Sequence, residues 1–190
     1  MTFRPFLPLL FVILASLPQA SIAGDAKSET VIVKEAKVVK AAYIYNFAKF
    51  IDWTNEDGVD TSTTPIVICV VGDDPVGSEL DEITSLQAKG RSISVLHIKS
   101  QDKIPHCHIL YIGASEQPQV ELLLQQVSNS EVLTVSDLPG FAERGGMIGF
   151  ASKRGRVQIE INVPRARSVG LRINSKLLEI ARIIPPLTTS

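Results

Sequence analysis

The stretch "PIVICVV" at residues 65–71 decides the fold class. It is a continuous run of apolar, mostly β-branched residues, which is typical of a strand buried on both faces of a sheet. The next segment is "GDDPVG" (72–77), in which Asp74 is placed to cap a helix and Pro75 to occupy its first position. We therefore expect a buried strand followed by a helix over roughly residues 75–86, the first unit of an α/β fold.

The following segments continue this alternation of strands and helices. Further strands are expected at 91–98, 107–113 and 131–137, and an amphipathic helix at 117–128. Strands joined through helices run parallel and connect by right-handed crossovers. The sequence therefore predicts an α/β protein with a doubly wound, mostly parallel sheet flanked by helices.

The pattern changes near the C-terminus. "RVQIEINV" (156–163) alternates polar and apolar residues, and "KRG" (153–155) separates it from "GGMIGFAS" (145–152). Strict alternation on both sides of a glycine-containing turn predicts an antiparallel edge hairpin, with one buried face and one polar face. A last helix is expected over 174–184, before two prolines that would end it.

Residues 1–23 have the features of a secretory signal peptide. A short basic start precedes the apolar run "LPLLFVILASLP", and Ser21 and Ala23 form a small-x-small cleavage site. The run is shorter than the roughly 20 residues that cross a bilayer. We expect export to a bacterial periplasm, with cleavage after Ala23 or, alternatively, after Ala20.

The expected mature chain consists of a mobile tail at 24–33 and one domain at 34–190. The full chain has 19 basic and 20 acidic residues, so we expect no nucleic-acid partner. Glycine-rich nucleotide loops, zinc-protease helices and the G-x-S-x-G nucleophile elbow are absent from the sequence. Ser100 and Lys103 match the S-x-x-K motif, but the S-D-N and K-T-G motifs that accompany it are missing. The sequence therefore assigns no catalytic residue and no cofactor, and we expect a protein that is not an enzyme.

Two cysteines stand at positions that strand pairing would bring together. Cys69 lies in the first strand and Cys107 opens the third, and these strands are commonly neighbours in a doubly wound sheet. In an oxidising compartment a disulfide is favoured over the alternative of two buried thiols. A disulfide would remove Cys107 as a metal ligand beside His106 and His108, leaving His97 as the nearest third ligand, and we assign no metal site.

The segment "AAYIYNFAKFIDW" (41–53) is richer in aromatic residues than core packing requires. It belongs to a helix expected over 34–50, whose lysines form only a narrow polar stripe. A helix with so wide an apolar surface is usually covered on more than one side. We therefore expect a partner contact here, with a second copy or a regulated protein, through Ala41, Tyr45 and Trp53.

The polar face of the last predicted strand is a candidate ligand site. Arg156 and Glu160 lie on that face, and Arg167 and Arg172 follow it. Guanidinium groups near a carboxylate favour an anion or an amino acid. A solvated edge with surface ion pairs is the alternative, and the residues alone leave both open.

Six segments, in order along the chain, resemble the YfiR family of exported bacterial proteins. They are "KAAYIYNFAKFIDW" (40–53), "ICVVGDDPVG" (68–77), "CHILYIG" (107–113) with Ser115 and Glu116 after it, "LTVSDLPGFAERGGMIGF" (133–150), "GRVQIEIN" (155–162) and "LRINSKLLEIAR" (171–182). The resemblance implies a periplasmic α/β protein that dimerises and is not an enzyme. It also implies that Cys69 and Cys107 form the family's sheet-bridging pair, and that small ligands bind near Glu160, Arg167 and Arg172.

The resemblance implies partners as well. The best-understood type of member inhibits an inner-membrane diguanylate cyclase by binding its periplasmic sensor domain, which controls cyclic-di-GMP and biofilm. An OmpA-like outer-membrane lipoprotein sequesters that inhibitor, and other members accompany sensor kinases instead. Some relatives carry a second cysteine pair in the stretch matching 139–150, which this sequence lacks.

Overall fold

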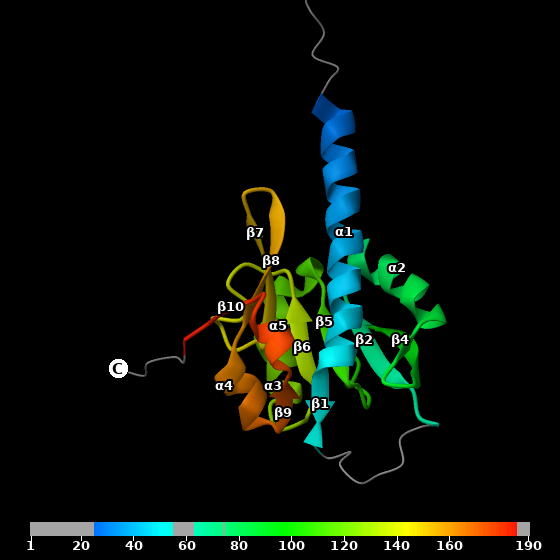
Figure 1. The fold of residues 1–190 in the computed structure, drawn as a ribbon, viewed down its shortest axis with the longest axis vertical. Coiled ribbons are helices and arrows are strands. Elements are labelled where there is room, and N and C mark those ends of the chain that lie inside the picture. The colour runs from blue at the N-terminus through cyan, green and yellow to red at the C-terminus, as the bar shows by residue number, and fades with distance from the viewer. Residues whose placement is uncertain (1–24, 55–62, 74, 186–190) are drawn as a thin grey trace, which may run out of the picture.

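The computed structural model describes residues 25–54, 63–73 and 75–185 (Figure 1). The predicted signal peptide and the predicted capping residue Asp74 lie outside these ranges. In the part of the chain that the structure describes, no helix combines the length and the apolarity of a membrane span.

An eight-stranded sheet forms the centre of the fold. Its strands are β2 (Ile66–Val71), β3 (Gln87–Ala88), β4 (Arg91–Ile98), β5 (Ile109–Ile112), β6 (Leu133–Ser136), β7 (Ile148–Lys153), β8 (Arg156–Ile161) and β10 (Arg182–Ile183). Their spatial order is β10-β8-β7-β6-β5-β2-β4-β3, and the five strands from β4 to β7 pair in parallel. The predicted α/β class with a mostly parallel sheet is confirmed.

Helices cover both faces of this sheet, and a small second sheet closes one end. The helices are α1 (Asp25–Phe50), α2 (Pro75–Glu82), α3 (Val120–Gln126), α4 (Val163–Ser168) and α5 (Ser175–Leu178), with 3₁₀ turns η2 (Ile83–Ser85) and η3 (Ala114–Gln119). The second sheet pairs β1 (Ile51–Trp53) with β9 (Leu171–Ile173) in antiparallel fashion. The N-terminal part of α1 projects past the sheet, beside the β7–β8 hairpin (Figure 1).

The two sides of the sheet hold separate hydrophobic clusters. On β2, Ile66, Ile68 and Val70 join the cluster that includes α1 and α2. Cys69 and Val71 point to the opposite side and join the cluster under α3. Successive strand residues face opposite ways, so this continuous apolar run is buried on both faces, as the sequence predicts.

The β7–β8 hairpin forms as expected, with one difference at the edge. Arg154 and Gly155, the two central turn residues, have φ of 52° and 75°. Positive φ at both positions is typical of a two-residue type I′ turn. However, β10 pairs in parallel outside β8, so β8 is not the outermost strand, and Glu160 on its expected polar face is only 7% exposed.

Two helix predictions are corrected. Helix α1 begins at Asp25 rather than Lys34, so residues 25–33, expected as a tail, continue the helix; they contain no glycine or proline that would break it. The last helix, expected over 174–184, is the four-residue α5 followed by β10. The tertiary pairing of β10 with β8 overrides the local helical pattern there.

Candidate functional site

A cavity of about 500 Å³ opens between α1, the loop after β6 and the β7–β8 hairpin. We call it the hairpin cavity. Its apolar lining includes Ala36, Pro139, Phe150, Ala151 and Val157, and its charged lining is Lys40, Asp137, Glu143, Arg156, Glu160 and Arg182. Apolar walls with a few converging charges are the usual make-up of a small-molecule site.

Glu160 is the most buried charge of the hairpin cavity. Strand pairing sets Arg182 of β10 directly beside it, and Arg182 donates from Nε and Nη2 to Glu160 Oε1 at 3.0 and 2.7 Å. The Nη2 group also donates to Glu143 Oε1 at 2.9 Å. These hydrogen bonds, first to Glu160 and then to Glu143, raise the pKa of Arg182 above its ordinary value. The guanidinium therefore holds two carboxylates at one end of the cavity.

A second ion pair joins α1 to the loop after β6. Lys40 Nζ donates to Asp137 Oδ2 at 2.6 Å, and both side chains are less than one-fifth exposed. The other oxygen, Asp137 Oδ1, is buried without a hydrogen-bond partner in the described part of the chain. A buried acceptor of this kind costs stability unless a donor reaches it. Helix α1 therefore supplies one wall of the cavity, and the Lys40–Asp137 pair fixes that wall to the loop after β6.

The structure brings together two of the four predicted ligand residues. Arg156 and Glu160 both line the hairpin cavity. Arg167 lies exposed in α4, and Arg172 lies exposed in β9, whose partner strand is β1; neither lines that cavity. Arg182 was missed, because its position depends on a two-residue strand that has no local sequence signal.

The outward face of α1 is largely apolar. Val38 is 46% exposed and Val39 is 41% exposed, and Ala42 beside them is also exposed. Val38, Ala42 and Tyr45 follow one another at intervals of four and three, so they form one stripe along the helix. Tyr45 is half-buried, and its hydroxyl donates to the Gln87 carbonyl oxygen at 3.0 Å. We call Val38, Val39, Ala42 and Tyr45 the α1 outer face.

Two residues predicted for partner contact lie inside the domain. Ala41 is 3% exposed because it shares the inward face of α1 with Ile44 and Ala48. Trp53 is 6% exposed because α1 ends at Phe50 and β1 carries Trp53 into the pairing with β9. Neither side chain is available to a partner of the folded domain.

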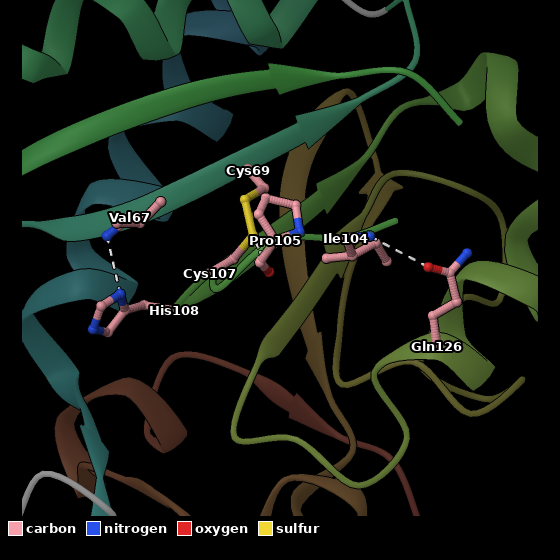
Figure 2. The surroundings of a disulfide bond; sticks show 7 residues. All are labelled: Val67, Cys69, Ile104, Pro105, Cys107, His108 and Gln126. Carbon is pink, nitrogen blue, oxygen red and sulfur yellow. Dashed lines mark hydrogen bonds between the residues drawn. A yellow bond between two sulfur atoms is a disulfide. The ribbon is translucent and has the colours of Figure 1, made fainter. Parts of the chain in front are cut away.

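Cys69 and Cys107 are joined in a disulfide that links β2 to the start of β5 (Figure 2). Their Cα atoms are 5.9 Å apart, and both residues are almost fully buried. The parallel pairing of β2 with β5 places the two residues together, as the sequence predicts.

The histidines serve other contacts. His108 Nδ1 accepts from the Val67 N–H at 3.0 Å (Figure 2), and its ring meets that of His106 edge-on. His97 lies elsewhere, 2.9 Å from Asp81 Oδ1. Within the described ranges, no three His, Cys, Asp or Glu residues are grouped so that they could hold a metal ion.

Comparison with models of known protein families identifies the family to which the chain belongs. The family model described as YfiR/HmsC-like matches residues 37–182, which covers α1 from Lys37 through to β10. The chain belongs to the YfiR/HmsC-like family. A search of curated proteins found no match. The family is regulatory rather than catalytic, and membership indicates a periplasmic regulator connected with diguanylate cyclase signalling.

Family membership fits the geometry of the candidate sites. The hairpin cavity has charges and apolar walls suited to binding, and the α1 outer face has exposed valines suited to a protein contact. The α1 outer face and all lining residues of the hairpin cavity except Ala36 lie within the matched residues, and α1 contributes to both sites.

Proposed function

We propose that this protein is a periplasmic regulator that binds and inhibits the periplasmic sensor domain of an inner-membrane diguanylate cyclase. The observation that carries the proposal is the apolar α1 outer face, on a chain that belongs to a family of periplasmic regulators. Inhibition would lower cyclic-di-GMP and restrain biofilm formation.

The exposure of the α1 outer face supports a contact at this place. Val38 and Val39 are both more than two-fifths exposed on the same helix, next to an exposed Ala42. Clustered apolar side chains on a surface mark contact sites more often than scattered ones do. Tyr45 adds an aromatic ring with a polar end, a residue type enriched at interface hot spots.

The family suggests further partners for the same face. A second copy of this chain would cover it in a homodimer, and an OmpA-like outer-membrane lipoprotein would compete for it and so release the cyclase. We propose the homodimer and the lipoprotein as partners ranked below the cyclase. The α1 outer face is apolar and carries no charge pattern that would select either of them.

Val38→Glu tests this surface with little risk to the fold. Val38 is 46% exposed and Glu is a good helix former, so the melting temperature should change little. A charge buried against an apolar partner should weaken binding at least tenfold. In the cell, cyclic-di-GMP and biofilm should therefore rise.

Leu122→Glu is the matched control. Leu122 is 55% exposed on α3, which covers the opposite face of the sheet, so the same charge should leave repression intact. Equal effects of the two variants, or none from Val38→Glu, would remove the α1 outer face from the proposal.

A second function is supported by the hairpin cavity. We propose that it holds a small ligand and that the protein acts as a sensor subunit, on a histidine kinase or another output. Ala36 and Lys40 line the cavity from α1, so a bound ligand would touch the helix that carries the α1 outer face. Thermal shift against nucleotides and amino acids tests this, since a ligand of the folded state raises its stability. Arg156→Ala, at the exposed rim, should weaken any shift that arises in this cavity.

A further inference from the structure

A second cavity, of about 450 Å³, lies at the carboxyl ends of the central strands. We call it the switch-point cavity. Its polar lining is Asp73 after β2, His97, Lys99, Ser100 and Gln101 at and after the end of β4, and Ser115 and Glu116 after β5. It shares no lining residue with the hairpin cavity and includes none of the α1 outer face.

The topology of the sheet explains why a cavity forms there. β2 lies between β4 and β5, and the chain leaves β2 through α2 toward β4, while β5 lies on the other side. The loops after β2 and β5 therefore diverge at the same end of the sheet. In open α/β sheets, ligands bind in the crevice at this point.

Gly72 lets the two loops approach each other. Its φ is +87°, a conformation that other residues rarely adopt. A Cβ at this position would lie 2.5 Å from Ser115 Oγ and 2.8 Å from Glu116 Oε1. The next N–H, of Asp73, donates to Ser115 Oγ at 3.0 Å. Because Gly72 has no side chain, Ser115 and Glu116 can pack against its backbone and form the floor of the cavity.

Glu116 is a buried carboxylate that forms no ion pair with any residue in the described ranges. It is 8% exposed, and its one side-chain donor in the described residues is Ser115 Oγ, at 3.2 Å. A carboxylate that receives a single side-chain hydrogen bond keeps most of its acceptor capacity unused. A carboxylate accepts several hydrogen bonds, so Glu116 can still receive an ammonium group from a ligand.

The opposite wall supplies a positive charge. Lys99 lies exposed at the end of β4, and among the described residues neither Lys99 nor Glu116 is in an ion pair. His97 is already paired with Asp81. Two strand spacings, about 10 Å, separate the ends of β5 and β4, and the flexible lysine stem shortens the distance that a ligand must span. Asp73 at the rim disfavours a phosphate.

We propose that the switch-point cavity binds a small zwitterion, with its ammonium group on Glu116 and its anionic group on Lys99. The site is separate from the α1 outer face, so it stands or falls independently of the proposed cyclase contact. The switch-point cavity would give the regulator a site for a small periplasmic solute at the carboxyl ends of its central strands.

Thermal unfolding of the full mature chain with a graded set of probes tests the proposal. Glycine, β-alanine and γ-aminobutyrate carry both charges at increasing separation, while butylamine and butyrate carry one each. At least one zwitterion should raise the melting temperature by roughly 3–6 °C at about tenfold excess over its dissociation constant. Butylamine and butyrate should each give a smaller shift. If no zwitterion stabilises the protein, or if one charge suffices, the proposal is wrong.

Variants then locate the site. Glu116→Gln and Lys99→Gln should each weaken binding of the active zwitterion at least tenfold, whereas Lys103→Gln, an exposed lysine outside the cavity, should not. If Glu116→Gln does not fold, the binding measurement on Lys99→Gln still tests the proposal, because Lys99 is exposed and its replacement should not disturb the fold. Undiminished binding by Lys99→Gln, or an equal loss in Lys103→Gln, would place the ligand elsewhere and overturn the assignment.

Discussion

Replacing Cys69 and Cys107 together by Ala should lower the stability of the domain by about 4 kcal/mol. The disulfide joins residues 38 positions apart, and a cross-link of that loop length removes about 13 cal/mol/K of entropy from the unfolded chain. At 25 °C this corresponds to about 4 kcal/mol. For a domain of this size, each kcal/mol shifts the melting temperature by about 2–4 °C, so a fall of roughly 8–16 °C is expected.

Calorimetry of the oxidised and reduced wild type beside the double variant measures this effect. Both sulfur atoms lie in the cluster under α3, so Ala is preferred to Ser, which would add a buried hydroxyl. Reductant should lower the melting temperature of the wild type toward that of the variant and leave the variant unchanged. A variant that melts within about 2 °C of the oxidised protein would show that the disulfide adds little to the stability of the domain.

Three further predictions follow from the cavity, the core and the N-terminus. Arg182→Ala should destabilise the protein by about 1–3 kcal/mol in chemical denaturation, because it removes the donors to the buried Glu160 while Arg182 itself is 46% exposed, whereas Arg154→Ala at the exposed hairpin turn should cost less than about 0.5 kcal/mol. Phe47→Ala should cost about 3–5 kcal/mol by the same assay, because the ring is fully buried; a loss below about 1 kcal/mol would contradict its place in the core. Intact mass of the exported protein should show a chain that begins at Gly24 or Ser21, and a full-length product would contradict export.

The central strands were predictable because their signals are local. The run at 66–71 is apolar without a break, and a sheet strand buried on both faces requires that. The hairpin was predictable because Gly155 stands at a turn that needs positive φ. The Cys69–Cys107 pairing followed from the neighbouring positions of two parallel strands.

The incorrect sequence predictions concern residues whose positions are set by contacts with residues far away in the sequence. Trp53 looked like the end of an aromatic helix, but β1 pairs with β9 far along the chain, and that pairing buries it. Arg182 looked like the end of an amphipathic helix, yet its strand register sets it beside Glu160. Helical spacing carries no information on either contact, so only part of the hairpin cavity could be predicted.

Inhibition of a membrane diguanylate cyclase through its periplasmic domain is the function that we propose for this protein. The direct test is titration calorimetry of the mature protein against the periplasmic sensor domain of a membrane diguanylate cyclase from the same organism, with cyclase activity measured in reconstituted membranes. We expect saturable binding that Val38→Glu weakens at least tenfold and Leu122→Glu leaves unchanged, together with a loss of cyclase activity when the wild type is added. Absence of binding, or binding that leaves the cyclase fully active, would contradict the proposed function.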